Sequence, residues 1–376
     1  MSEYRLDELC EILDSKRVPL SAMQRAKRHG PYPYYGAQSV IDHVDDYLLD
    51  GEYLLVAEDG ANLVTRTQDI ANLVNGKIWV NNHAHILGYN GKCPLRLLGF
   101  LLNHSNISPY VTGCAQPKLN QDNLRRIKIS LPEKVDEVSS ILSSLDSKIE
   151  NNHKICANLE AQAQALFKHW FIDFAPFKDG KFVESELGMI PEGWKVGKLG
   201  EIADITMGQS PSGSSYNEEG NGSIFYQGRS EFGFRFPSIR LFTTEPKKYA
   251  EPLSTLLSVR APVGDINVAT VECCIGRGLA SIKSKYNHHS FIYYLLMSMK
   301  RTFDVYNGEG TVFGCINKDT LNGISIVVPP VSVVKAFNDI VEELDCMILE
   351  SHNENLRLIM LRDTLLPKLM SGEIKV

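Results

Sequence analysis

A long amphipathic segment occurs twice in this chain and constrains its fold more than any other feature. Between residues 133 and 171, apolar residues recur every seven positions, and no Gly or Pro interrupts them. This spacing predicts a continuous helix of about 60 Å with a coiled-coil seam. A helix of that length needs a partner helix, because it cannot bury its apolar stripe alone.

The partner is predicted at the C-terminus, where a second helical segment begins near Val331. An offset of 199 residues places Leu145 on Leu344 and Ile149 on Ile348, so the second segment repeats the first. We expect the two helices to pack as an antiparallel coiled coil, with polar seam residues fixing its register. The predicted seam consists of Leu142, Leu145, Ile149, Asn152, Leu159, Leu166, Val341, Leu344, Ile348, Leu358 and Leu365.

The segments that precede the two helices are also related to each other. At an offset of 190, Leu9 and Asp14 match Leu199 and Asp204, and at an offset of 197 six of thirteen residues are identical between 120–132 and 317–329. We predict a duplication about a pseudo-two-fold axis. Its parts are a first domain at 1–132, a central helix at 133–175, a linker at 176–192, a second domain at 193–330 and a C-terminal helix at 331–376.

Each globular half has a mixed pattern. Short apolar runs such as 53–57 and 255–259 predict strands, whereas 95–103 and 291–299 predict helices. Gly- and Ser-rich loops, such as the one at 207–222, separate these elements. The predicted fold class is therefore α+β, with two mixed α/β domains in tandem and two long helices.

Charge separates the helices from the globular halves. Residues 131–192 carry 6 Lys/Arg against 11 Asp/Glu and residues 331–376 carry 5 against 8, whereas residues 193–330 carry 14 against 12. This charge distribution favours protein partners for the helices and allows the globular halves to bind a polyanion. We expect a cytoplasmic protein, because no apolar run approaches the ~18 residues of a membrane span and the N-terminus lacks a signal-peptide core.

Catalytic motifs are absent from the sequence. It contains no G-x-x-x-x-G-K-[ST] phosphate loop, no H-E-x-x-H, no G-x-S-x-G and no C-x-x-C. His83 and His85 alternate as on a strand, but no third ligand lies nearby, so a structural role is favoured over a metal site. We therefore assign no catalytic residue, no metal and no cofactor to this chain.

Basic residues beside aromatic and amide residues mark candidate contacts to nucleic acid. Arg25, Lys27 and Arg28 precede the stretch PYPYYGAQ at 31–38, and Gln227 and other polar residues follow Tyr226 in the second half. Lys and Arg neutralise phosphates, and Arg, Asn and Gln read base edges. The full candidate set is Arg25, Lys27, Arg28, Tyr34, Tyr35, Gln38, Arg66, Ser210, Ser212, Tyr216, Gln227, Arg229, Arg235, Arg240 and Arg260.

Several stretches in a fixed order resemble those of a known family, the specificity subunit of type I restriction–modification systems. They are PYYGAQ (33–38), LLVAEDGANL (54–63), LFKHWFIDFAPF (166–177), SELGMIPEGWKVGKLGEI (185–202), GQSPSGSSYNEEG (208–220), SVRAPVGDI (258–266), CIGRGLASI (274–282) and LLPKLMSGEI (365–374). The resemblance covers essentially the whole chain.

The resemblance implies two target-recognition domains that each read one half of a bipartite site in double-stranded DNA, with the helices setting the spacing. Two methylation subunits would bring S-adenosylmethionine, and restriction subunits would bring ATP and Mg²⁺. In a related alternative, one partner chain both cleaves and methylates. Two other classes stay open, an enzyme with unrecognised motifs and a helical scaffold that binds no nucleic acid.

Overall fold

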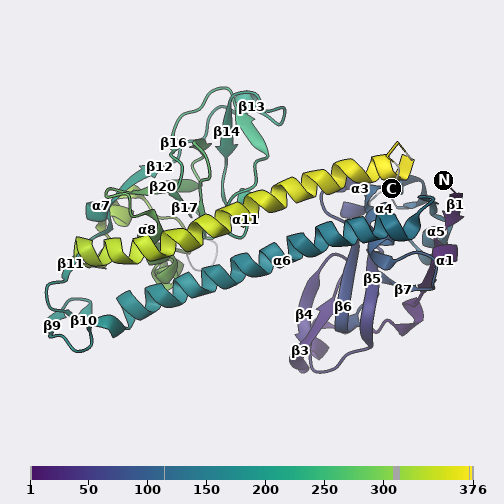
Figure 1. Cartoon of the computed structure of the whole chain (residues 1–376), viewed down its shortest axis with the longest axis horizontal. Helices are drawn as coiled ribbons and strands as arrows, with labels where there is room; N and C mark the ends of the chain where they lie inside the picture. Colours follow the sequence, from purple (N-terminus) through teal and green to yellow (C-terminus); the bar gives the residue numbers. More distant parts are fainter. Residues whose placement is uncertain (1, 114, 308–313, 372, 375–376) are drawn as a thin grey trace. The chain divides into compact units, whose positions relative to one another are not determined.

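The computed structural model describes residues 2–113, 115–307, 314–371 and 373–374 (Figure 1). The chain forms two compact units, of which unit 1 comprises Met1–Asn152 with Glu354–Val376 and unit 2 comprises His153–Asn353. Each unit holds one globular head together with part of each long helix, α6 (Val135–Phe167) and α11 (Val331–Ser371). The predicted stretch at 365–374 is described except for residue 372, and residues 375 and 376 of the predicted last domain lie outside the described part.

Head 1 is built on a six-stranded sheet with the order β2-β7-β5-β6-β3-β4. Its neighbouring strands are antiparallel except for β3 and β6, which are parallel. Helix α4 (Leu95–His104) packs on the sheet through buried leucines, as its apolar run predicts. The strands are β2 (Cys10–Ile12), β3 (His29–Tyr35), β4 (Val40–Val44), β5 (Leu49–Ala57), β6 (Ala71–Val80) and β7 (Ala84–Tyr89).

The two largest sheets of head 2 have the orders β12-β20-β17-β18 and β13-β15-β14-β19-β16. Helix α8 (His289–Ser298) is buried along most of its length and occupies the place in the chain that α4 has in head 1. The strands used below are β12 (Ala203–Met207), β14 (Ser223–Tyr226), β17 (Thr255–Ser258), β18 (Ile266–Val268), β19 (Cys273–Ile275) and β20 (Leu279–Ser284). The others are β13 (Tyr216–Asn217), β15 (Leu241–Thr243) and β16 (Tyr249–Ala250).

The two heads repeat the same elements, which the sequence repeat predicts. In head 1, β1 (Ser2–Arg5) pairs with β8 (Lys128–Leu131), and in head 2, β11 (Lys195–Lys198) pairs with β21 (Ser325–Val328). Helices α5 (Gln121–Arg126) and α10 (Lys318–Gly323) start at an offset of 197, and Asn120 and Asn317 cap them. The offset of 197 is therefore confirmed by the structure.

The predicted offset of 190 at the start of each head is wrong by three residues. Helix α1 (Leu6–Leu9) corresponds to α7 (Leu199–Ile202) at an offset of 193. The amide of Leu6 donates to Ile127 O (2.8 Å), and the amide of Leu199 donates to Ile324 O (2.9 Å). These contacts with residues distant in the chain set the register of the repeat. Identical residues within one short segment therefore do not determine it.

Within unit 1, the long helices lie side by side and antiparallel. The start of α6 packs Val138 and Leu142 against Leu366 and Leu369 near the end of α11. Further along, Asp146 accepts a hydrogen bond from Arg362 Nη1 (2.9 Å), and Lys148 pairs with Glu354 (3.1 Å). The residue numbers rise on one helix as they fall on the other, which confirms antiparallel packing in this unit (Figure 1).

The same pairing continues inside unit 2 with the other ends of the two helices. Cys156 Sγ contacts Ile348 O (3.7 Å), and the rings of Phe167 and Phe337 meet edge to face (5.7 Å between centroids). A π-helical turn at Lys168–Ile172 ends α6. All eleven predicted seam residues are buried or partly buried, as a helix-to-helix seam requires.

A polar pair interrupts the apolar seam of unit 1. Asn152, which is 1% exposed, donates through Nδ2 to Asn355 Oδ1 (2.9 Å) and to Glu354 Oε2 (2.7 Å). Asn355 Nδ2 faces Ile149 O at 3.4 Å. Buried amides that hydrogen-bond to each other favour one register, because a shifted register would leave them without partners.

Replacing Asn152 with Leu is expected to lower the free energy of unfolding by about 1–3 kcal/mol, because Asn355 then loses its buried partner. The double variant N152L/N355L removes both polar groups and should be close to neutral or more stable. Urea unfolding of the full chain measures both effects. The exposed neighbour Asn151, changed to Leu, serves as the control. Equal destabilisation by the single and double variants would contradict the argument.

Candidate DNA interface

Several strand ends of head 2 meet at one edge, which we call the loop edge of head 2. The amide of Gly208, after β12, donates to Leu279 O (2.9 Å), and the amide of Val259, after β17, donates to Gly278 O (2.9 Å). The amide of Gly276, after β19, donates to Tyr226 O at the end of β14 (2.8 Å). The loop edge of head 2 comprises residues 208–210, 227–229, 259–261 and 276–278.

Glycines allow the backbones at this edge to come close together. A Cβ on Gly276 would lie 2.7 Å from Gln227 O, and one on Gly278 would lie 3.1 Å from the same oxygen. A Cβ on Gly208 would collide with Gly276 O. The loops therefore pack main chain against main chain, and two side chains next to these glycines, Gln209 and Arg277, are exposed.

Four predicted residues, Ser210, Gln227, Arg229 and Arg260, lie on this edge, and all but the partly buried Ser210 are exposed. The structure adds Arg277, which the sequence analysis missed. Its amide donates to Ser210 Oγ (3.1 Å), and its side chain is exposed. The sequence feature that could have identified Arg277 is its position between two glycines in CIGRGLASI, one of the stretches that carry the family resemblance.

Arg235 was predicted to contact DNA, and that prediction is wrong because the side chain is 4% exposed. Its guanidinium lies 4.0 Å from the ring centre of Tyr293, pairs with Asp345 on α11 (2.7 Å) and with Glu160 on α6, and donates to Tyr294 Oη (2.6 Å). Burial alone would lower the pKa of Arg235, but Tyr293 and the neighbouring carboxylates raise it above its ordinary value. Arg235 thus fastens head 2 to both long helices within unit 2.

The remaining predicted residues of head 2 lie away from the loop edge. Arg240 is exposed and pairs with Glu218 and Glu231. Tyr216 is partly buried and donates to Pro211 O (3.1 Å), whereas Ser212 is exposed. These residues stay predicted contacts, although the structure does not bring them together with Arg260 and Arg277.

Head 1 has an equivalent loop edge, formed by residues 14–18, 36–38, 58–62 and 81–83. The amide of Glu58, after β5, donates to His83 O (2.9 Å), and the amide of Asn81, after β6, donates to Tyr35 O (3.1 Å). Gln38 lies on this edge and accepts from Asn62 Nδ2 (3.1 Å), while its own Nε2 has no partner in the described ranges. Tyr35 ends β3 beside it and is partly buried.

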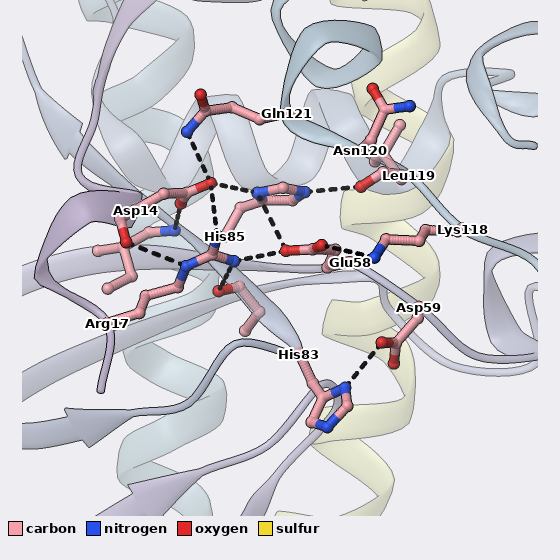
Figure 2. A network of polar contacts seen from close by, with 12 residues as sticks. Asp14, Arg17, Glu58, Asp59, His83, His85, Lys118, Leu119, Asn120 and Gln121 are labelled. Atoms are coloured by element: carbon pink, nitrogen blue, oxygen red, sulfur yellow. Dashed lines mark hydrogen bonds and ion pairs between the residues drawn. The ribbon is translucent and has the colours of Figure 1, made fainter. Parts of the chain in front are cut away.

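A network of charged side chains underlies the loop edge of head 1 (Figure 2). His85 is fully buried, and its Nδ1 lies 2.6 Å from Asp14 Oδ2 while its Nε2 lies 2.7 Å from Leu119 O. Both neighbours are acceptors, so a ring that carries a proton on each nitrogen satisfies both. Asp14 also accepts from the amide of Ile86 (3.0 Å).

Three further side chains, Arg17, Glu58 and Lys118, extend this network. Arg17 pairs with Asp14 (3.3 Å) and with Glu58 (2.5 Å), and Lys118 pairs with Glu58 (3.2 Å). Burial is the largest single effect on the pKa of Asp14 and raises it, but His85, the amide of Ile86 and Arg17 together outweigh burial and hold that pKa below its usual value. The pKa of Glu58 is lowered in the same way, because Arg17, His85 and Lys118 together outweigh the effect of burial. His83 pairs with Asp59 (2.7 Å), so both histidines have structural partners.

The basic cluster of head 1 is largely paired with acids. Arg25 binds Asp42 (2.9 Å), and Arg28 binds Asp45 (2.8 Å) while its guanidinium lies 4.7 Å from the ring centre of Trp79. Lys27 is exposed and has no ion pair within the described residues. These cations lie at the end of helix α2 (Ala22–Arg25) and in the segment between it and β3, whereas Gln38 lies on the loop that follows β3.

Two more predicted contacts of head 1 have structural roles. Tyr34 is 1% exposed, and its hydroxyl accepts a hydrogen bond from the amide of Leu20 (2.8 Å). The side chain is therefore buried, and the prediction that Tyr34 contacts DNA is wrong. Arg66 has a left-handed backbone (φ 52°) and donates to Leu102 O (3.1 Å) at the end of α4. Its guanidinium satisfies carbonyls at the end of that helix, which leaves one nitrogen, Nη1, buried and without a partner among the described residues.

Comparison with known proteins identifies the family. A model of the type I restriction modification DNA specificity domain matches residues 1–161 and again residues 191–359. The chain belongs to the type I restriction–modification specificity family. The two matches confirm the tandem of target-recognition domains.

Individual relatives agree with this assignment. The specificity subunit is 34% identical to a putative type I restriction enzyme MjaX specificity subunit of Methanocaldococcus jannaschii, over 100% of this chain and 94% of the relative. It is 28% identical to the MjaIX specificity subunit of the same organism, over 74% and 69% of the two chains. The type I relatives do not favour the related arrangement with one cleaving and methylating partner.

A solved structure supports the fold. A type I restriction–modification system S subunit from M. genitalium aligns with a TM-score of 0.58 at 16% identity, covering 98% of this chain and 95% of that one. The predicted α+β fold class is confirmed. Among the described residues, no helix has the length and hydrophobicity needed to cross a bilayer. The same ranges contain no cluster of three or more His, Cys, Asp or Glu residues suited to a metal ion.

Proposed function

We propose that this specificity subunit binds double-stranded DNA at a bipartite target, with each head reading one half of the site. The long helices set the gap between the half-sites and dock two methylation subunits, and restriction subunits join the same complex. The chain itself is non-catalytic and acts in the cytoplasm. Methylation with S-adenosylmethionine and cleavage with ATP and Mg²⁺ belong to the partners.

The observation that carries this proposal is the pair of heads built on one set of elements but bearing different side chains at equivalent loop edges. A repeated framework with different loops suits the reading of two different half-sites. The antiparallel seam makes α6 and α11 a stiff connection within each unit, and Asn152 and Asn355 fix its register in unit 1. Stiffness is what a fixed gap requires, because half-sites must lie at a set spacing along the double helix.

Sequencing of N6-methyladenine in DNA from cells that express this chain with its methylation subunits tests the proposal. The expected result is methylation at a split sequence with one constant gap. Gel-shift assays of the purified complex should then show weaker binding when the gap is lengthened or shortened by one base pair. Methylation at a continuous sequence, or binding that ignores the gap, would contradict a bipartite target. Transfer of a labelled methyl group by the chain alone would contradict the non-catalytic role.

Lengthening both long helices gives an independent measurement. Insertion of one heptad in both α6 and α11 keeps the seam in phase, because it adds two turns to each helix. The expected outcome is a change in the preferred gap or loss of binding to the original target. A seven-residue insertion in the exposed loop at residues 218–221 is the control and should leave the gap unchanged. An unchanged gap in the heptad variant would remove the helices from the control of spacing.

A further inference from the structure

The strand pairings show which residues of the two loop edges are equivalent. Glu58 and Val259 are equivalent, because their amides donate to His83 O and Gly278 O and their carbonyls accept from Leu119 and Ile316. The residues that follow them, Asp59 and Arg260, are therefore equivalent too. This correspondence allows the side chains of the two heads to be compared position by position.

Two further positions correspond in the same way. The amides of Asn81 and Gly276 donate to Tyr35 O and Tyr226 O, so the next residues, Asn82 and Arg277, are equivalent. Gln38 and Arg229 each lie three residues after these strand ends. At all three positions head 2 has an arginine, whereas head 1 has Gln38, Asp59 and Asn82.

The backbone segments that carry the three arginines of head 2 meet at Gly278. Arg277 precedes this glycine, and Arg260 follows Val259, whose amide binds Gly278 O (2.9 Å). Arg229 follows Gly228, whose Cα would lie 3.4 Å from a Cβ on Gly278. Each arginine is thus one residue away from a backbone group that touches Gly278, although they lie on three loops that are distant in sequence.

All three side chains are exposed, and few acids neutralise them. Arg260 and Arg277 have no ion pair within the described residues, and Arg229 pairs with Asp265 (3.1 Å), which Lys300 also binds (3.2 Å). An exposed pair of this kind contributes little, so an incoming anion competes with Asp265 for the guanidinium. The cluster therefore presents a concentrated positive charge with free guanidinium donors.

The corresponding positions of head 1 lack this charge. Asp59 is an acid that pairs with His83 (2.7 Å), and the side-chain oxygen of Gln38 accepts a hydrogen bond from Asn62 (3.1 Å). Lys118 lies near this edge but is paired with Glu58 (3.2 Å). At these equivalent positions head 1 offers the amides of Gln38 and Asn82, which suit hydrogen bonds to base edges, whereas head 2 offers cations.

We propose that Arg229, Arg260 and Arg277 form a phosphate-binding site of head 2 that has no cationic counterpart at the equivalent positions of head 1. The ligand is the phosphate backbone of DNA, because guanidinium groups bind phosphate oxygens in a bidentate manner. This inference rests on the proposed DNA-binding function. Its consequence is that head 2 supplies more of the salt-dependent affinity than head 1 does.

The test uses the full chain in complex with its methylation subunits and a fluorescent 40-base-pair duplex. Anisotropy titrations from low to high KCl give the slope of log K against log[KCl]. Each lost phosphate contact lowers the magnitude of this slope by about 0.9. R260A/R277A is therefore expected to lower it by about two, on duplexes of any sequence. R260K/R277K keeps the charge and should keep most of the slope.

Two matched variants complete the design. K181A/K195A removes two exposed cations from the same unit at positions that precede α7 and β12, and its slope should equal that of the wild type. D59R/N82R copies the arginines of head 2 onto head 1 and should steepen the slope. Thermal unfolding of each complex shows whether the variants fold.

The outcomes separate this inference from the function on which it rests. A wild-type complex without salt-dependent DNA binding would reject DNA recognition itself. A wild-type complex that binds DNA, beside an R260A/R277A complex with an unchanged slope, would overturn the phosphate site and leave DNA recognition standing. A loss confined to one half-site sequence with an unchanged slope would also overturn it, because that result identifies base readout instead.

Discussion

Replacing Arg235 with Met is expected to lower the free energy of unfolding of unit 2 by about 3–5 kcal/mol. The guanidinium is buried between Asp345 on α11 and Glu160 on α6, and it lies over the ring of Tyr293. Met fills a similar volume without charge, so both carboxylates stay in the interior without their cation. Urea unfolding, together with hydrogen exchange in α8, measures the loss.

A control and a rescue separate charge from packing. Arg301 is exposed and unpaired within the described part of the chain, so R301M should change stability by less than about 0.5 kcal/mol. The triple variant R235M/E160Q/D345N also removes the orphaned charges and should regain most of the stability. If the triple variant is as unstable as R235M, then lost packing and not unpaired charge explains the effect.

Replacing Asp14 with Met is expected to cost head 1 a similar amount, about 3–5 kcal/mol. Asp14 holds His85 (2.6 Å) and Arg17 (3.3 Å) in the buried network of Figure 2. Without its carboxylate, the fully buried His85 loses its anionic neighbour, and the amide of Ile86 loses its acceptor. Urea unfolding of the full chain again gives the magnitude.

Head 2 shows how the same positions are filled without charge. The strand register makes Met207, Val259 and Ala280 equivalent to Asp14, Glu58 and His85, and all three contribute to an apolar core. The variant D14M/R17S/E58V/H85A copies head 2 and should be as stable as the wild type, or up to about 4 kcal/mol more stable. A quadruple variant less stable than D14M would show that the network has a role the apolar set does not replace.

The network also predicts a pH dependence. Asp14 and Glu58 have lowered pKa values in the folded protein, so their contribution to stability is present above their unfolded pKa values of about 4. It is lost as the pH falls through the folded values, because the unfolded chain then binds more protons. Between pH 5 and pH 2 the wild type should lose stability more steeply than the quadruple variant. Parallel pH profiles would contradict this assignment.

Local patterns of the sequence determined the repeated elements of this protein. Heptad spacing predicted α6 and α11 and their seam, because residues three, four and seven apart share one helix face whatever the rest of the chain does. Short apolar runs likewise predicted β17 and α4. The order of family stretches, such as CIGRGLASI, resembled the specificity family before any contact was known.

Tertiary structure decided the register of the repeat and the roles of individual charges. Arg235, Arg240 and Arg260 look alike in the sequence, yet Arg235 is buried because partners 75 and 110 positions away surround it, while Arg260 is exposed. Arg277 joined the candidate site through a turn that packs against two other loops. The physical reason is that periodicity records short-range geometry, whereas burial, ion pairing and the convergence of loops depend on contacts between residues distant in the chain.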